Sequence, residues 1–179
     1  MTKLTLLFFS FLLLINNSIT AQNESFSCEN EAYLFLQNTI GIWEVSSKDR
    51  TSPEVYEQNS GTSTITSLIE GCGIQESFRG IFRNKIYARE VLIIGKDSTH
   101  VEMVTLDSEH SSFSSLQGEI SENEMTVYWY RNPEKRKLQS KYILNYMSAD
   151  QFEFSSFLST DYGDTWSLTH QRKYKRLQK

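Results

Sequence analysis

The sequence predicts an all-β protein, a closed antiparallel up-and-down barrel of about ten strands that follows a short N-terminal helix. Turn-forming residues recur about every 10 to 14 positions along most of the chain. The runs between them, such as 86–94 and 126–130, are rich in β-branched and aromatic residues. Because the connections are short, neighbouring strands pair as a meander, and closure removes the exposed edges of such a sheet. A sandwich of two sheets is the alternative.

The elements are expected in a simple order. Residues 30–36, with Tyr33, Leu34 and Leu36 apolar, predict a short helix at one mouth of the barrel. Ten strands are expected near 41–48, 60–70, 73–82, 85–94, 99–107, 111–120, 124–131, 137–146, 151–159 and 165–177. Glycine, asparagine, aspartate and serine mark the connections, as at 95–98 and 121–123.

The first 21 residues resemble a secretory signal peptide, with Lys3, an apolar run at 4–15 and small or polar residues up to Ala21. The apolar run is too short to cross about 30 Å of hydrocarbon as a helix. We therefore expect a single barrel domain over 22–179, secreted or periplasmic, with no stable membrane span after cleavage. A retained anchor is the alternative.

The two cysteines, Cys28 and Cys72, both follow the expected cleavage point. In an oxidising compartment they are expected to form a disulfide, and two unpaired buried thiols are the alternative. The net charge of −4 and the lack of a basic cluster larger than 172–176 argue against a nucleic-acid partner.

Residues 159–166 match the Asp-box, a turn motif best known from sialidase propellers. The oxygens of Ser159 and Asp161 are expected to hold the backbone of a hairpin, with Trp166 packed beneath it. A propeller repeats this box in every blade, whereas this chain has one copy. The motif therefore predicts a structural turn and no sialidase activity.

Gly41 and Trp43 fit the G-x-W signature of lipocalins and their calycin relatives. Together with 71–76, 106–108 and 159–166, in this order, they resemble a bacterial family of unknown function made of secreted lipocalin-like (calycin-like) barrels. The resemblance covers about 34–177 and implies the fold without implying an activity. It also implies that Trp43 closes one end of the barrel beneath an arginine of the last strand, Arg172 or Arg176.

Buried carboxylates give the most suggestive candidate chemistry. Glu76 alternates with Ile74 and Phe78, so an inward face would bury it among apolar side chains, and Glu90 is a second candidate. The possible partners are Arg79, Arg131, Tyr128, Tyr142 and Tyr146. The expected ligand-contacting residues are Glu76, Phe78, Met103, Arg131 and Tyr142. An internal salt bridge without a ligand is the alternative.

No nucleophile motif, phosphate-binding loop or zinc spacing is present. We therefore expect no metal, no cofactor and no catalytic residue, with haem bound through His170 as a minor alternative. The leading function is an exported barrel that binds a small apolar or amphipathic molecule. An enzyme with acid–base carboxylates and a filled structural or partner-binding envelope protein are the alternatives. An interior cavity of at least about 300 Å³ would favour the first two, and a carboxylate with a raised pKa would favour the enzyme.

Overall fold

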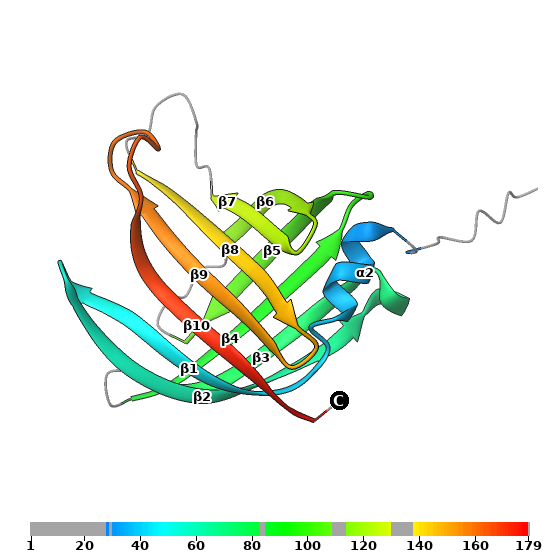
Figure 1. Ribbon diagram of the computed structural model, residues 1–179, viewed down its shortest axis with the longest axis horizontal. Helices are drawn as coiled ribbons and strands as arrows, with labels where there is room; N and C mark the ends of the chain where they lie inside the picture. Colours follow the sequence, from blue (N-terminus) through cyan, green and yellow to red (C-terminus); the bar gives the residue numbers. More distant parts are fainter. Residues whose placement is uncertain (1–27, 29, 83–84, 109–113, 130–137, 179) are drawn as a thin grey trace, which may run out of the picture.

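The computed structural model describes residues 28, 30–82, 85–108, 114–129 and 138–178. The described residues form ten antiparallel strands that close into one barrel, each strand pairing with its neighbour in sequence and β1 pairing with β10 (Figure 1). The predicted fold class is confirmed. The elements are α2 (Glu31–Gln37), β1 (Gly41–Ser52), β2 (Val55–Leu68), the 3-10 helix η1 (Ile69–Gly71), β3 (Gly73–Phe82), β4 (Lys85–Gly95), β5 (His100–Asp107), β6 (Ser114–Ser121), β7 (Glu124–Trp129), β8 (Gln139–Ser148), β9 (Gln151–Ser159) and β10 (Ser167–Gln178).

The β1–β2 hairpin is longer than the sequence predicted. The prediction ended the first strand at 48 and began the second at 60, but the ladder continues to the pair Ser52↔Val55. The added residues are mostly polar, so the apolar alternation that marks a half-buried strand fades although the backbone pairing persists. Pro53 and Glu54 form the turn, with Glu54 in the left-handed region at φ 65°. Predicted strand residues 111–113, 130–131 and 137 lie outside the described residues.

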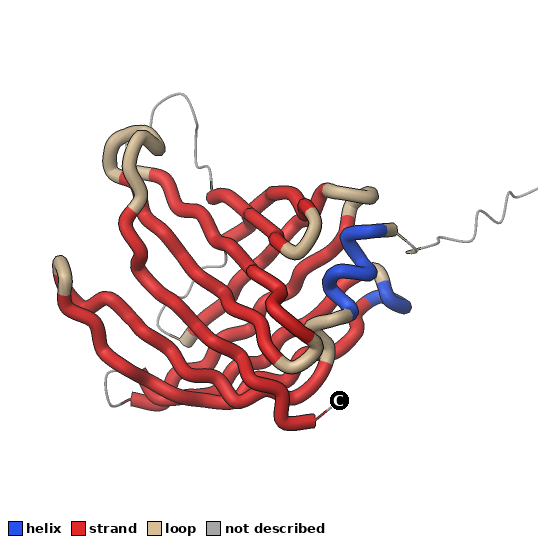
Figure 2. Tube along the Cα trace, in the orientation of Figure 1, coloured by secondary structure: helices blue, strands red, loops and turns tan. Residues whose placement is uncertain are grey.

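Strands make up the wall of the barrel, and loops and turns connect them at its two ends (Figure 2). Alternate side chains of every strand point into the interior and form its core. Its buried apolar members are Ala32, Phe35, Leu36, Trp43, Val45, Ile65, Ile74, Phe78, Val91, Ile93, Val101, Met103, Leu116, Ile120, Met125, Val127, Leu144, Phe152, Phe154 and Tyr174. The apolar set occupies the middle of the barrel and the end next to α2. Polar residues enter the interior toward the opposite end.

Helix α2 covers one end of the barrel (Figure 1). Its N-cap residue Asn30 accepts a hydrogen bond from the backbone N–H of Tyr33 at 2.8 Å, and Phe35 and Leu36 are buried in the core. The disulfide Cys28–Cys72 joins the segment before α2 to the turn that follows η1, as predicted. This covalent link indicates an oxidising compartment. The predicted signal peptide, 1–21, lies outside the described residues, and no described helix is long and apolar enough to cross a membrane.

Trp43 is fully buried at the same end, and the guanidinium of Arg176 lies 4.0 Å from the centre of its ring. Of the two arginines considered from the sequence, Arg176 therefore covers Trp43. Arg172 does not, because it lies four residues earlier on β10 and points into the barrel above Phe78, 5.7 Å from that ring.

The Asp-box forms the hairpin between β9 and β10 (Figure 1). Ser159 Oγ accepts from the backbone N–H of Gly163 at 2.8 Å and donates to Asp161 Oδ1 at 2.7 Å. Asp161 in turn accepts from the backbone N–H and the hydroxyl of Thr165, at 2.9 and 2.6 Å. Trp166 is partly buried, with the ammonium of Lys141 4.5 Å from its ring. All these contacts serve the turn.

Candidate functional site

A buried polar cluster lies inside the barrel, where β2, β3, β4 and β10 contribute one side chain each. Glu76 occupies its centre: Ser63 Oγ and the Tyr174 hydroxyl each donate to Oε1 at 2.8 Å, and Arg89 donates to Oε2 at 2.8 Å. The hydroxyl of Tyr174 also accepts from Arg89 at 3.2 Å. All four side chains point inward because they alternate along their strands with buried apolar residues.

Charge pairing within this cluster controls its protonation. Burial alone would raise the pKa of Glu76, but Arg89 and the hydrogen bonds from Tyr174 and Ser63 outweigh it and hold the pKa below its ordinary value. Burial and the adjacent Glu76 raise the pKa of Tyr174. Glu76 is therefore a carboxylate at neutral pH and Tyr174 a neutral donor. Within the described chain, Arg89 Nε is the buried side-chain atom that lacks a hydrogen-bond partner.

Arg172 lies next to the cluster but does not join it. Its side chain is buried, 9% exposed, and makes no hydrogen bond or ion pair with any described residue. Burial and the like charge of Arg89 lower its pKa, although a guanidinium stays protonated at physiological pH. Arg172 is thus a buried guanidinium without a hydrogen-bond or ion-pair partner among the described residues, although the charge of Asp49 acts on it from nearby.

A cavity of about 220 Å³ opens at the end of the barrel opposite α2. It is lined by Asp49, Phe82, Tyr87, Arg89, Thr105, Asp107, Tyr142, His170 and Arg172. The side chain of His170 is 38% exposed, so the cavity communicates with solvent beside it. Aromatic rings form part of the wall, and the polar part contains the guanidinium groups of Arg89 and Arg172 together with the carboxylates of Asp49 and Asp107. Burial raises the pKa of Tyr142, so its hydroxyl is a hydrogen-bond donor at neutral pH.

Asp49 and His170 form a pair at the rim of this cavity. His170 Nδ1 lies 2.7 Å from Asp49 Oδ1, and Ser47 and Asn59 donate to Oδ2 at 2.5 and 3.0 Å. Burial would raise the pKa of Asp49, but these hydrogen bonds and nearby Arg172 lower it to about 2. Because Asp49 is then ionised and can only accept, Nδ1 of His170 carries the proton.

The structure brings the five predicted ligand-contacting residues together only in part. Tyr142 lines the cavity, whereas Glu76 lies deeper and reaches the cavity wall through Arg89. Phe78 and Met103 are buried in the apolar core, and Arg131 lies outside the described residues. The residues missed from the sequence are Asp49, Tyr87 and Arg89, together with the position of Arg172 in the cavity wall.

The predicted partners of Glu76 and the second candidate carboxylate need correction. Glu90 faces outward, where it accepts from Ser77 Oγ at 2.5 Å and pairs with Arg79 at 3.3 Å. Arg79 is therefore not a partner of Glu76, and Arg89 takes that place. The sequence contained a signal for the inward direction of Arg89, because Arg89 lies on the same strand face as Val91 and Ile93. The other face of this strand is also apolar, however, so the pattern does not decide which face points inward.

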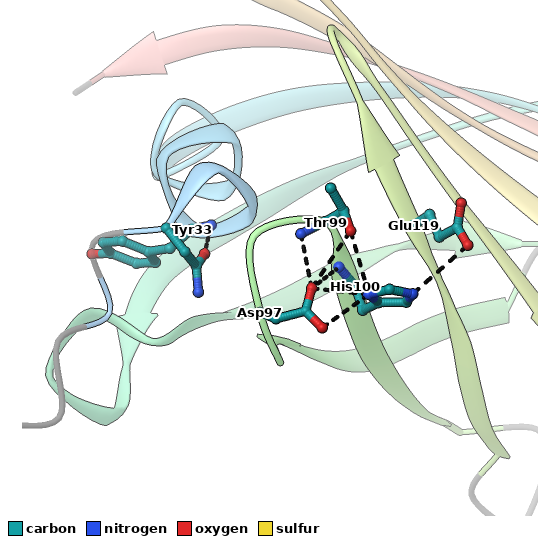
Figure 3. Close-up of polar contacts among 6 residues, drawn as sticks. Tyr33, Asp97, Thr99, His100 and Glu119 are labelled. Carbon is teal, nitrogen blue, oxygen red and sulfur yellow. Dashed lines mark hydrogen bonds and ion pairs between the residues drawn. The ribbon is translucent and has the colours of Figure 1, made fainter.

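A larger groove of about 680 Å³ lies on the outer face of β5, β6 and β7. At its edge, Asp97 Oδ1 accepts from the backbone N–H groups of Thr99 and His100, both at 2.9 Å, and His100 Nε2 lies 3.8 Å from Glu119 (Figure 3). The Thr99 and His100 N–H groups hold the pKa of Asp97 below its ordinary value, and Asp97 raises that of His100. These exposed contacts cap the turn before β5. No described group of three or more His, Cys, Asp or Glu side chains is arranged to hold a metal ion.

Among solved structures, the chain is similar to the S-type phycobiliprotein lyase CPES from Guillardia theta, with a TM-score of 0.54, 11% identity, and coverage of 87% of this chain and 97% of that one. It is also similar to a redesigned β-barrel, b11L5F_LGL (TM-score 0.47, 12% identity, covering 84% and 98%), and to EF1p2_mFAP2b bound to DFHBI (0.44, 10%, 84% and 99%). At this identity the likeness to the lyase concerns the fold alone. No curated protein matches the chain.

The family model described as "Protein of unknown function (DUF1579)" matches residues 30–176. This stretch includes α2, all ten described strands apart from the last residues of β10, and every residue that lines the cavity. The chain therefore belongs to this family of proteins of unknown function.

Proposed function

We propose that this protein is an exported barrel that binds a small amphipathic molecule in the cavity opposite α2. The observation that carries the proposal is the composition of the cavity wall. Aromatic side chains (Phe82, Tyr87, Tyr142) adjoin buried polar groups within a space that opens to solvent. Ligand sites are typically concave and apolar with a few placed polar groups.

The size of the cavity limits the ligand. At about 220 Å³ it falls below the range of roughly 300–1,000 Å³ that is usual for sites of drug-sized molecules. By the threshold of about 300 Å³ set from the sequence, volume alone favours a filled structural barrel, and the proposal therefore rests on the composition of the cavity wall. A small molecule, or one end of a longer molecule, fits this space.

The electrostatics support binding over acid–base catalysis. A general acid that works near neutral pH needs a raised carboxyl pKa. Glu76 and Asp49 have lowered pKa values, because both carboxylates accept several hydrogen bonds and lie near guanidinium groups. Export is supported by the disulfide Cys28–Cys72, since such bonds persist in oxidising compartments, and by the signal-peptide pattern at 1–21.

Native mass spectrometry of the protein purified from its own host tests this function. Thr105→Phe should fill the cavity, because Thr105 is part of its wall. Val104→Phe is the matched control, since Val104 lies on the outer face of the same strand. A small molecule should co-purify with the wild type and the control and be absent from Thr105→Phe. If the wild type carries no molecule and Thr105→Phe is the more stable variant, the barrel is a filled structural one.

A further inference from the structure

We infer that the ligand carries a carboxylate, a singly charged planar anion, and that Arg172 is its receptor with the Tyr142 hydroxyl as a second donor. This inference rests on the proposed function and names the chemical class of its ligand. It starts from one feature of the barrel interior, a buried guanidinium that makes no hydrogen bond or ion pair with a described residue.

Arg172 is 9% exposed and makes no hydrogen bond or ion pair with any described residue. Taking a charge out of water is costly unless a counter-ion and hydrogen bonds replace the water. Arg89 lies close enough to add like-charge repulsion. A strand position that faces the interior would accept an apolar residue more easily, so the retained guanidinium indicates a partner that is not part of the described chain.

The nearby acidic groups are already engaged. Glu76 binds Ser63, Tyr174 and Arg89 through its two oxygens. Asp49 is engaged by His170 through Oδ1 and by Ser47 and Asn59 through Oδ2. Asp107 also has an interaction of its own. Neither Glu76 nor Asp49 makes a hydrogen bond or ion pair with the five N–H donors of Arg172, and Arg172 contributes to the cavity wall.

The charge balance selects the type of anion. Asp49 and Asp107 line the same cavity as Arg172, so a doubly charged anion would meet two carboxylates across a small space. A singly charged anion meets less of that repulsion and can still pair with Arg172. The planar guanidinium matches a carboxylate with two parallel hydrogen bonds. Phe82, Tyr87 and Tyr142 then contact the apolar part of the acid.

Calorimetric titration with benzoate and benzamide tests the inference, because these probes share shape and differ in charge. Benzoate should bind the wild type at least about tenfold more tightly than benzamide, as expected for a charge-assisted hydrogen bond. Arg172→Met should remove this difference. Lys173→Met is the matched control, since it deletes one positive charge from the exposed neighbour on β10, and it should keep the wild-type preference.

The melting temperatures of the same variants give a second test, which needs no probe ligand. Without ligand, Arg172→Met should melt at a higher temperature than the wild type, because an unpaired buried charge is removed. A lower melting temperature would mean that Arg172 serves packing on Phe78 and would overturn its role as a receptor.

The outcomes separate this inference from the proposed function. Equal binding of benzoate and benzamide would leave a binding barrel but overturn the anion. Inorganic phosphate that competes as well as benzoate would overturn the carboxylate. If neither probe binds while a host molecule co-purifies, a neutral host molecule overturns the inference and an acidic one supports it. If neither probe binds and the host-purified protein is empty, the proposed function fails as well.

Discussion

Trp43 connects three parts of the chain through one ring. Its indole N–H donates to the carbonyl of Thr39 at 2.8 Å, and the edge of Phe152 approaches the ring with centroids 4.7 Å apart. Arg176 lies over the ring and also donates to the carbonyls of Ile40 and Asn38, at 2.6 and 2.8 Å. The ring therefore anchors β10 and the connection between α2 and β1, and its burial fixes the closed end of the barrel.

Replacing Trp43 by alanine should lower the free energy of unfolding by about 3–5 kcal/mol, since the side chain is fully buried and the cavity left behind cannot refill. Denaturant unfolding measures this change. Trp166→Ala is the control, because Trp166 is only partly buried, and its cost should be smaller. A loss under about 1 kcal/mol for Trp43→Ala would contradict the anchoring role.

Asp49 should make the protein sensitive to acid. Its pKa of about 2 in the folded state lies below the ordinary value of 3.8, so it stabilises the fold above pH 4 and this stabilisation is lost as the pH falls through about 2. Asp49→Asn should lower the free energy of unfolding by about 2 kcal/mol at pH 7. It should also flatten the acid limb of the stability curve, which is the fall in the free energy of unfolding below about pH 4. Asp164→Asn, at an exposed position, should leave that limb unchanged. If the free energy of unfolding changes with pH in the same way in the wild type and in Asp49→Asn, Asp49 does not make this contribution to acid sensitivity.

At the scale of elements, the Asp-box hairpin shows a short motif that specifies local geometry. Its Ser and Asp oxygens bind N–H and hydroxyl groups of the same turn, and Tyr162 adopts a left-handed φ of 65° at its tip. The Thr165 contacts lower the pKa of Asp161 to about 2. None of the residues that line the cavity belongs to this turn.

Asp161→Ala should lower the melting temperature by a few degrees, because two hydrogen bonds from Thr165 are lost. Asp164→Ala, in the same turn, removes a carboxylate that has no side-chain hydrogen bond to a described residue and should have little effect. Binding of the benzoate probe should be unchanged in both variants. Lost binding at an unaltered melting temperature would assign the turn to the site.

Strand β4 shows where sequence reasoning reached its limit. Tyr87, Arg89, Val91 and Ile93 face the interior, while Ile86 on the other face is 87% exposed at the end of the barrel. Both faces carry aliphatic residues, so apolar alternation does not identify the inner one. On β3 the row Ile74, Glu76 and Phe78 alternates clearly, and its inward direction was predicted. The order of strands and the helix were predictable for the same reason, since both depend on local patterns.

At the scale of the molecule, the site depends on contacts that no local pattern encodes. Tyr174 reaches Glu76 across 98 residues of sequence, and His170 reaches Asp49 across 121. Which residues meet inside a barrel depends on register and curvature together. The sequence thus allowed Glu76 to be placed inside but not its pairing with Arg89, nor the isolation of Arg172.

The disulfide should contribute to the stability of the whole barrel. Cys28 and Cys72 are 44 residues apart, and closing a loop of this length contributes about 4 kcal/mol in the chain-entropy model. The double variant Cys28→Ser, Cys72→Ser should therefore unfold at lower denaturant concentration. Titration of the denatured, unreduced wild type should find almost no free thiol. Two titratable thiols would show that the bond does not form in the protein as isolated.

Closure of the sheet also sets the order in which the chain can fold. The seam between β1 and β10 joins the two ends of the barrel sequence, and Arg176 of β10 binds the carbonyl of Ile40 across 136 residues. When the chain is synthesised from its N-terminus, the edge of β1 that pairs with β10 stays unpaired until β10 has been made. Such non-local pairing slows folding and leaves the unfinished barrel with two open edges. The seam thus postpones the native state until synthesis of β10 is complete.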